Sequence, residues 1–158
     1  MMRGRPTVMD KKGFDGFMSA LEGSDVEVLD DQYANWNRDD GFTVMQDILS
    51  RFSKIDAVGA QEDDIAIGVI QAVRQARRQD ELFVVGGGGM KDIVKRVMDG
   101  DELTPVDVLY PPSMISTAME LTALKLISNT PIEGEYILGS PLITQDNAED
   151  YYFPDSPF

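Results

Sequence analysis

Histidine and cysteine are both absent from the 158 residues of this sequence. Without cysteine there is no disulfide and no thiolate, and without histidine the chain lacks the commonest general base and the commonest metal ligand. Positive charge is also scarce, because 14 Lys and Arg residues stand against 28 Asp and Glu residues, a formal net charge of −14. Nucleic-acid binding depends on clustered Lys and Arg, so nucleic acid is not an expected partner.

Long hydrophobic runs are missing too. No stretch approaches the ~18 consecutive apolar residues of a membrane span, and the N-terminal "MMRGRPTVMDKKG" has no apolar segment of the kind found in a signal peptide. What the sequence does contain is an ordinary globular composition, with 42% hydrophobic and 27% charged residues. A chain of this length and composition is expected to form one domain with a hydrophobic core.

Strand-like and helix-like patterns alternate along the chain. Apolar runs predict strands at "VEVLD" (26–30), "DAVGA" (56–60), "LFVVG" (82–86) and "VDVLY" (106–110), with a short first strand in "MMRGR". Apolar residues at helical spacing predict helices across 14–21, 42–52, 65–73 and 90–98. This alternation is typical of an α/β fold with a doubly wound parallel sheet, in which all βα loops lie at one edge.

The segment 113–128, "SMISTAMELTALKLIS", is apolar around most of its circumference rather than along one stripe. A helix of this kind is normally buried on several sides. It therefore needs a partner surface, and self-association through it is expected if the chain occurs alone. The remaining residues, 129–158, hold four of the eight prolines and predict an extended tail with one possible strand at "EYIL".

Four consecutive glycines, Gly86 to Gly89, end the strand "LFVVG" and lead into a helix. They do not match a Walker loop, which needs a Gly-Lys-Ser/Thr ending, or a dinucleotide fingerprint, which opens the first βα unit. The alternative is a βα turn that must stay small because another group comes close to it. We favour this close-approach turn, which also leaves space and backbone N–H groups at the functional edge.

Polar side chains follow the strand "DAVGA" directly. Asp63 is the predicted N-cap of the next helix, and the acidic residues beside it favour the positive end of the helix dipole. In a functional interpretation, Gln61 and Glu62 accept hydrogen bonds from the hydroxyls of a polar ligand, and both interpretations stay open. No metal or other cofactor is expected here, because the chain has no histidine and no ordered ligand spacing.

Two aromatic residues belong to other loops of the same edge. Trp36, the only tryptophan, precedes a helix for which Asn37 is the predicted N-cap, and an indole ring stacks well on the apolar face of a sugar. Tyr110 begins "YPPS" (110–113), whose prolines restrict the backbone. This segment is expected to be a crossover or hinge, with the Tyr110 hydroxyl available for a hydrogen bond.

Five segments, in this order, resemble one family. They are "DKKGFDGFMSAL", "ANWNRDDGFTVMQDIL", "IDAVGAQEDDIAIGVIQAV", "LFVVGGGGMKDIVKRVMDG" and "YPPSMI". Together they are similar to the C-terminal part of periplasmic type I sugar-binding proteins of the ribose-binding class. These are the solute receptors of ABC importers, and they are related to the effector domains of LacI-type regulators. The resemblance covers about residues 3–128.

This resemblance implies a domain organisation. Members of the family have two doubly wound lobes joined by crossover strands, with a sugar held between them. Residues 1–109 are then the C-terminal lobe, with a Rossmann-like sheet of flavodoxin-type strand order. Residues 110–128 are a crossover and a helix that belongs to an N-terminal lobe, and 129–158 are a tail that returns over the first part. A periplasmic location, ABC importer membrane subunits as partners, and a first lobe and signal peptide outside this sequence are also implied.

The resemblance implies ligand contacts as well, some of them altered. The implied contacts are Lys11, Trp36, Gln61, Glu62, Asp63, Gly88 and Tyr110. Trp36 matches the aromatic residue that stacks on the sugar. Three positions differ from the family, because Lys11 stands in place of arginine, Glu62 in place of asparagine and Gly88 in place of aspartate. We therefore expect a sugar or polyol other than ribose.

The expected function is binding of that ligand as the solute-binding component of an ABC importer, with no bond made or broken and with weak or absent binding by this chain alone. An effector domain of a LacI-type regulator is the alternative. Upstream sequence would discriminate the two, since a regulator has a helix-turn-helix there. A third hypothesis, an α/β enzyme using Glu62 and Lys11, is disfavoured because histidine, cysteine and a nucleophile elbow are absent.

Overall fold

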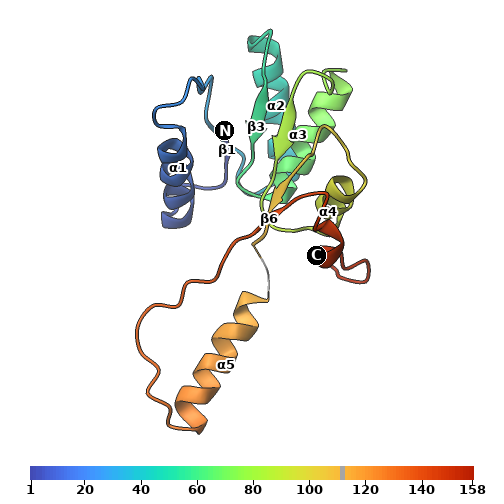
Figure 1. Ribbon diagram of the computed structural model, residues 1–158. Coiled ribbons are helices and arrows are strands. Elements are labelled where there is room, and N and C mark those ends of the chain that lie inside the picture. The colour runs from blue at the N-terminus through green and yellow to red at the C-terminus, as the bar shows by residue number, and fades with distance from the viewer. Residues whose placement is uncertain (111–112) are drawn as a thin grey trace.

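The computed structural model describes residues 1–110 and 113–158. It shows an α/β lobe from which one helix projects (Figure 1). The elements in chain order are β1 (Met2–Arg3), α1 (Val8–Leu21), β2 (Gln32–Tyr33), α2 (Arg38–Arg51), β3 (Ala57–Gly59), α3 (Asp63–Gln75), β4 (Phe83–Val85), α4 (Lys91–Met98), β5 (Asp107–Val108), α5 (Met114–Ile127), β6 (Leu142–Ile143) and the 3-10 helix η1 (Ala148–Tyr151).

The strands follow one another in a single row. β1 pairs with β2 and β3 with β4, both in parallel, and β5 pairs with β6 in antiparallel orientation. Two parallel bridges, from Met2 to Ala60 and from Gly88 to Leu109, connect the three pairs. The resulting order, β2-β1-β3-β4-β5-β6, contains the flavodoxin-type order of the first five strands. The predicted doubly wound α/β fold is confirmed, and β6 adds an antiparallel edge strand that the sequence pattern did not predict.

Two predicted strands are wrong. The segment 26–30 contains no strand, and pairing with β1 starts only at Gln32, whose N–H donates to the Met1 carbonyl (3.1 Å). The segment "EYIL" contains none either, and its Ile137 is exposed. A strand-like pattern becomes a strand only beside an unpaired strand edge. In this fold the edge of β5 is taken by β6, further along the chain.

The predicted helices are confirmed, with one cap reassigned. Asn37 caps α2 as predicted, because its side chain accepts hydrogen bonds from two N–H groups of the first turn (2.9 and 3.1 Å). The predicted cap of α3 is wrong. Glu62, not Asp63, caps this helix, by accepting a hydrogen bond from the Asp64 N–H (2.9 Å). Asp63 is the first helical residue, and its carboxyl bonds instead to the loop between β4 and α4.

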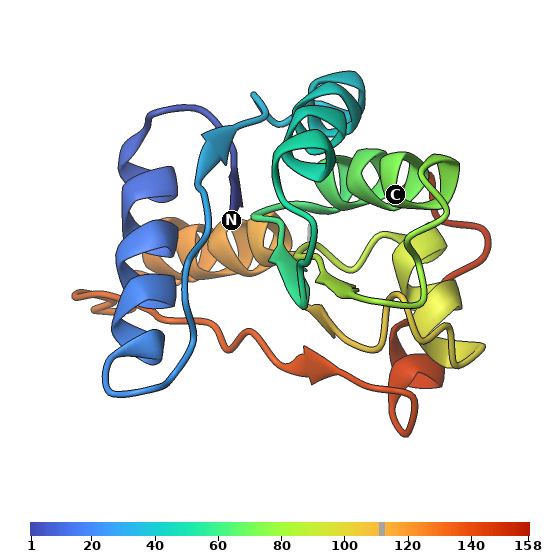
Figure 2. The ribbon, with the colours of Figure 1, turned by 90° about the horizontal axis from the view of Figure 1, so that it is seen from above.

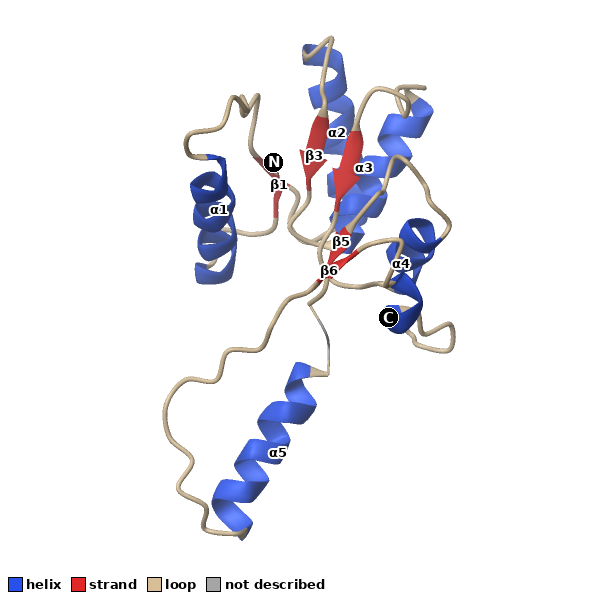
Figure 3. Cartoon of the chain, viewed as in Figure 1, coloured by secondary structure: helices blue, strands red, loops and turns tan. Residues whose placement is uncertain are grey.

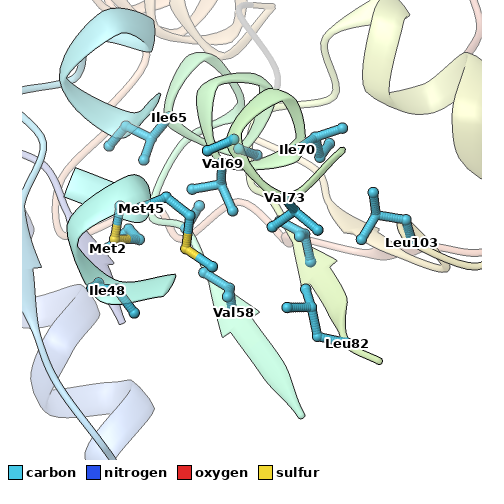
Figure 4. Packing of buried hydrophobic residues seen from close by; sticks show 14 of the residues in the cluster. Met2, Met45, Ile48, Val58, Ile65, Val69, Ile70, Val73, Leu82 and Leu103 are labelled. Carbon is cyan, nitrogen blue, oxygen red and sulfur yellow. The ribbon is translucent and has the colours of Figure 1, made fainter. Parts of the chain in front are cut away.

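Helices α2 and α3 pack against each other on one side of the sheet (Figures 1 and 2). The main hydrophobic core lies between these helices and the sheet (Figure 4) and includes Met45, Val58, Ile65, Val69 and Val73. Side chains alternate along a strand, so Val58 and Val84 are buried whereas Ala57 and Phe83, on the other face of β3 and β4, are exposed.

Helix α5 projects from the lobe (Figures 1 and 3), and none of its residues is buried. Residues 129–141 return along it without a helix or strand and re-enter the lobe at β6. The predicted turn in "YPPS" includes residues 111–112, which lie outside the described residues, and the division into 1–109, 110–128 and 129–158 stays a prediction. No helix in the described part of the chain is both long and apolar enough to cross a membrane.

Candidate ligand-binding site

The C-terminal ends of the parallel strands lie at one edge of the lobe, and direct contacts connect the loops that follow them. The Gln61 N–H, after β3, donates to the carbonyl of Met2 in β1 (3.0 Å). The Tyr110 N–H, after β5, donates to the carbonyl of Gly88 in the glycine loop (3.2 Å). The Tyr110 hydroxyl lies 3.7 Å from the sulfur of Met9 at the start of α1. Segments distant in the sequence therefore form one continuous rim.

The side chain of Gln61 ties two of these loops together. Its Oε1 accepts a hydrogen bond from the Gly4 N–H (2.9 Å), and its Nε2 donates to the carbonyl of Asp10 (3.0 Å). One end of the amide is thus bonded to the backbone just after β1 and the other to the first turn of α1. Gln61 lies where it was predicted, and its contacts are those of a residue that positions the rim.

Trp36 lies against the first strand. A Cβ atom at Gly4 would come within 2.0 Å of the indole ring, so the ring occupies the space that a side chain at position 4 would need. Asn35 and Trp36 both have positive φ values (54° and 56°), a conformation that is strained for an aromatic residue. The half-buried ring packs against the main core at one side, and this packing maintains the strained backbone.

Asp63 and Asp107 form a buried pair of carboxyl groups beneath the rim. Asp63 Oδ2 accepts a hydrogen bond from the Met90 N–H (2.7 Å), and Asp107 Oδ2 accepts one from the Gly89 N–H (3.0 Å). Both side chains are fully buried. Both Oδ1 atoms lie near Gly86, where a Cβ would be 2.3 Å from that of Asp63 and 3.1 Å from that of Asp107. A single proton shared between the two carboxyls satisfies these oxygens.

The pKa values agree with a shared proton. Burial, followed by the charge of Asp107, raises the pKa of Asp63 to about 8. Burial also raises the pKa of Asp107 to about 6, while hydrogen bonds from neighbouring groups act in the opposite direction. Two like charges this close in a low-dielectric interior repel strongly, so the pair retains one proton near neutral pH.

This pair explains Gly86 and Gly88, whereas a Cβ at Gly87 would make only ordinary contacts, 3.5 Å from the Gln61 carbonyl oxygen. A side chain at Gly86 would collide with both carboxyls, and a Cβ at Gly88 would lie 2.8 Å from Asp63 Oδ2. Gly89 has a positive φ of 85°, and a Cβ there would lie 2.7 Å from Leu109. The prediction of a close-approach turn is confirmed, and the group that comes close is the Asp63–Asp107 pair.

Glu62 and Lys11 differ in how far they are held in place. Glu62 is half-buried, and burial, followed by the charge of Asp64, raises the pKa of its carboxyl. Its Oε2 caps α3 by accepting a hydrogen bond from the Asp64 N–H (2.9 Å), and backbone hydrogen bonds from Asp64 and Ile65 act against the rise in pKa. Lys11 is exposed on α1, where its ammonium pairs with Asp15 one turn later. Lys11 is the member of the predicted set with the least structural constraint.

An ion pair that the sequence did not indicate reinforces the same edge. The guanidinium of Arg3, at the end of β1, binds Asp10 with two hydrogen bonds (3.0 and 2.8 Å) and Asp31 with a third (2.9 Å). It also lies over the rings of Phe14 and Tyr33. The Arg3 guanidinium holds the pKa of Asp10 below its usual value. Arg3 is the last residue of β1, and no pattern in the sequence indicated its contacts.

The structure thus brings most predicted site residues together. Gln61 is connected to Gly4, beneath Trp36, while Tyr110 and Gly88 share a backbone hydrogen bond and Asp63 lies behind Gly88. Glu62 begins α3 at the same edge. The rim offers an aromatic face, a carboxylate and a hydroxyl. The N–H groups of Gly88, Gly89 and Met90 are not available to a ligand, because they bond to Val108, Asp107 and Asp63, contrary to the expectation from the sequence. No group of three metal-binding side chains occurs among residues 1–110 and 113–158.

A doubly wound lobe that gathers polar and aromatic groups at its strand ends defines a class of domain that binds small polar ligands. Comparison with known families identifies which one. Residues 1–129 match the family described as "Periplasmic binding protein domain". This chain belongs to the periplasmic binding protein family, as the sequence resemblance predicted.

Individual relatives agree with this assignment. The xylitol-binding protein of Mycolicibacterium smegmatis is 31% identical over 144 residues, which cover 87% of this chain and 38% of that protein. The ribose import binding protein RbsB of Escherichia coli is 30% identical over 131 residues, covering 83% of this chain and 43% of the relative. The chain therefore spans less than half the length of these curated relatives.

Solved structures show the same lobe. The Caulobacter myo-inositol binding protein, solved with myo-inositol bound, has a TM-score of 0.82 at 25% identity. The matched region covers 94% of this chain and 52% of that protein. A solute binding protein from Mycobacterium smegmatis with bound glycerol has a TM-score of 0.84 at 25% identity. The matched region covers 98% of this chain and 54% of that protein. All four are named as binding proteins, and the glycerol-bound one as an ABC transporter solute binding protein.

Proposed function

We propose that this chain supplies one lobe of a sugar- or polyol-binding site in the solute-binding component of an ABC importer, acting in the periplasm. The observation that carries the proposal is the single rim on which Trp36, Glu62, Gly88 and Tyr110 follow four different strands. Relatives named for xylitol, ribose and myo-inositol support the ligand class and favour a transport receptor over a LacI-type regulator.

In this proposal each residue has a physical role. The Trp36 ring stacks on the apolar face of the ligand, and the half-buried Glu62 carboxylate accepts a hydrogen bond from a ligand hydroxyl. The Tyr110 hydroxyl is a donor or an acceptor at the rim, and the Lys11 ammonium is a donor. Gln61 acts by positioning, because its amide is already bonded to the backbone at both ends.

The altered positions favour a ligand other than ribose. Gly88 supplies no carboxylate, and the Asp63 carboxyl behind it is buried and directed at the Met90 N–H. Glu62 is then the one carboxylate of the predicted set that remains partly accessible. A single carboxylate beside an indole ring suits a polyol or a different sugar, because one of its oxygens already caps α3 and fewer ligand hydroxyls can be bound.

No bond is made or broken in the proposed function. In a two-lobed receptor, ligand bound between the lobes stabilises a closed state through contacts that the open state lacks. One lobe makes only part of those contacts. We therefore expect this chain alone to bind its ligand weakly, with a dissociation constant in the millimolar range, on the order of −4 kcal/mol.

Fluorescence titration tests the proposal, because Trp36 is the only tryptophan. Xylitol, myo-inositol, D-allose and D-ribose are added to the chain, and at least one polyol or non-ribose sugar is expected to give a saturable change. Glu62→Gln should weaken that binding about tenfold, the loss of a charge-assisted hydrogen bond. Lys54→Ala, before β3 at the opposite edge, is the matched control. No saturable change up to roughly 100 mM, or equal loss in both variants, contradicts the proposal.

A further inference from the structure

Asp63 and Asp107 have buried oxygens that no group of the described chain satisfies. Neither Oδ1 atom has a hydrogen-bond partner among residues 1–110 and 113–158. No lysine or arginine in the same part of the chain pairs with either carboxyl. A buried carboxylate without a counter-charge is costly, so the arrangement is stable when one proton lies between the two groups.

The outer oxygens of the same two carboxyls hold the glycine loop. Asp107 Oδ2 and Asp63 Oδ2 accept hydrogen bonds from two successive backbone N–H groups, those of Gly89 (3.0 Å) and Met90 (2.7 Å). The loop has little room to adjust, because even a Cβ at Gly86 would lie 2.3 Å from Asp63 Oδ1. A change in the separation of the two carboxyls therefore has to move the loop.

The loop in turn positions Tyr110. The Gly88 N–H donates to the Val108 carbonyl (2.8 Å), and the Tyr110 N–H donates to the Gly88 carbonyl (3.2 Å). These bonds join the loop to the end of β5, as a parallel bridge between Gly88 and Leu109. A movement of the loop therefore reaches the Tyr110 hydroxyl, which lies at the rim 3.7 Å from the sulfur of Met9.

We infer that Asp63 and Asp107 are proton-dependent positioning residues for the ligand site. With one shared proton they hold the glycine loop and Tyr110 in the binding geometry. When that proton passes to solvent, two carboxylates face each other in a low-dielectric interior and repel strongly, so the loop moves and ligand binding weakens. The ligand step of this inference rests on the proposed function, whereas the movement of the loop does not.

No other charged group takes over the role of the proton. The charged side chains in the turn before α3 and in the first turns of α3 and α4, besides Asp63 itself, are Glu62, Asp64, Lys91 and Asp92. Asp64 and Lys91 are bound to other groups, the Arg38 guanidinium (2.7 Å) and the Ser156 carbonyl (2.6 Å). Glu62 is negative and disfavours ionisation of Asp107. Strands β3, β4 and β6 carry no charged residue.

A pH titration of the ligand-free chain by NMR tests the movement of the loop. The backbone carbon shifts of Gly89, Met90 and Tyr110 are expected to change together between about pH 6 and about pH 9. The midpoint should lie near pH 8, because burial, followed by the charge of Asp107, raises the pKa of Asp63 to about 8. Shifts that stay constant over this range, or that change in the loop but not at Tyr110, overturn the inference.

Two variants assign the titration to the pair. Asp63→Asn replaces the protonated carboxyl with an uncharged amide of the same shape, so the loop shifts should no longer titrate. Asp107→Asn should act in the same way, and it serves if Asp63→Asn does not fold. Asp92→Asn is the matched control, because Asp92 is an exposed carboxylate in the first turn of α4 and its removal should leave the titration unchanged. A titration that persists in a folded variant of the pair overturns the inference.

Ligand affinity gives the functional measurement. With the polyol that binds best, the dissociation constant of the unmodified chain and of Asp92→Asn should rise at least about threefold from about pH 7 to about pH 9. In Asp63→Asn it should stay constant. The same rise in Asp63→Asn overturns the inference. Absence of binding at every pH counts against the proposed function, and the titration without ligand distinguishes that failure from a failure of the carboxyl pair.

Discussion

At the scale of single residues, a buried pair of carboxyl groups determines the shape of the glycine loop. Asp63 and Asp107 lie 44 positions apart in the sequence and share a site beneath the rim, where backbone N–H groups bind one oxygen of each. Burial raises the pKa of both carboxyls. The glycine loop wraps this pair because no side chain fits beside it.

Replacing Gly86 with alanine tests the packing of this loop. The new Cβ would lie 2.3 Å from Asp63 Oδ1, so Gly86→Ala should lower the free energy of unfolding by about 1–3 kcal/mol, the usual cost of overpacking. Gly16→Ala is the control, because Gly16 is in helix α1 with nothing within 4 Å of a Cβ and should gain up to about 1 kcal/mol. Urea unfolding measures both. Equal stability of the two variants would refute the close approach.

The shared proton predicts an unusual pH dependence. The pKa of Asp63 (about 8) and that of Asp107 (about 6) exceed the ordinary aspartate value, so the folded chain holds more protons than the unfolded chain between about pH 4 and pH 8. This contribution to stability therefore falls as pH rises through that window and is fully lost above it. In Asp63→Asn, the fall in the free energy of unfolding between about pH 4 and pH 8 should be smaller by at least about 1 kcal/mol, which corresponds to a pKa shift of about one unit. If the urea midpoint changed with pH in the same way in Asp63→Asn and in the unmodified chain, a shared proton between Asp63 and Asp107 would be excluded.

At the scale of elements, helices were predictable and short strands were not. Helix α3 shows its apolar periodicity within its own thirteen residues, and that signal is local. A two-residue strand such as β2 is defined by the neighbour that pairs with it. The segment "VEVLD" has the apolar pattern of a strand, but it is Gln32 and Tyr33 that pair with β1. The Asp63 cap was misassigned for the same reason, because its partner, Met90, lies 27 residues away.

The caps of α2 and α5 give a matched pair of variants. The Asn37 side chain accepts two hydrogen bonds at the start of α2, so Asn37→Ala should cost about 1 kcal/mol of stability. Ser113 precedes α5 without a capping hydrogen bond from its side chain, and Ser113→Ala should change stability by less than about 0.5 kcal/mol. Thermal unfolding of both variants is the measurement, and a larger loss at Ser113 would be inconsistent with the cap assignments.

At the scale of the whole molecule, net charge dominates the response to salt. With a net charge of −14, like charges repel across the folded surface, whereas exposed ion pairs such as Lys54–Asp56 contribute little. Raising NaCl from about 0.05 M to about 0.5 M shortens the screening length and should raise the melting temperature. KCl at the same ionic strength should act alike. A falling melting temperature would mean that attractive ion pairs outweigh the repulsion.

The rim itself could be predicted in part. Strand-end positions indicated that Trp36, Glu62, Gly88 and Tyr110 lie at one edge, because parallel strands end together. The sequence did not indicate that Gln61 would be engaged at both ends by the backbone. It gave no sign either of the Arg3–Asp10 pair, since such contacts depend on side-chain directions that spacing does not determine.

Amide shift mapping of the chain by NMR, during titration with the polyol that binds best, tests the central claim most directly. The account predicts that the largest shifts occur at the Trp36 indole and at the amides of Glu62, Gly88 and Tyr110, and that Trp36→Ala removes them. Saturable shifts confined to the exposed sheet face around Phe83, or to helix α5, with the strand-end residues unmoved, would contradict it.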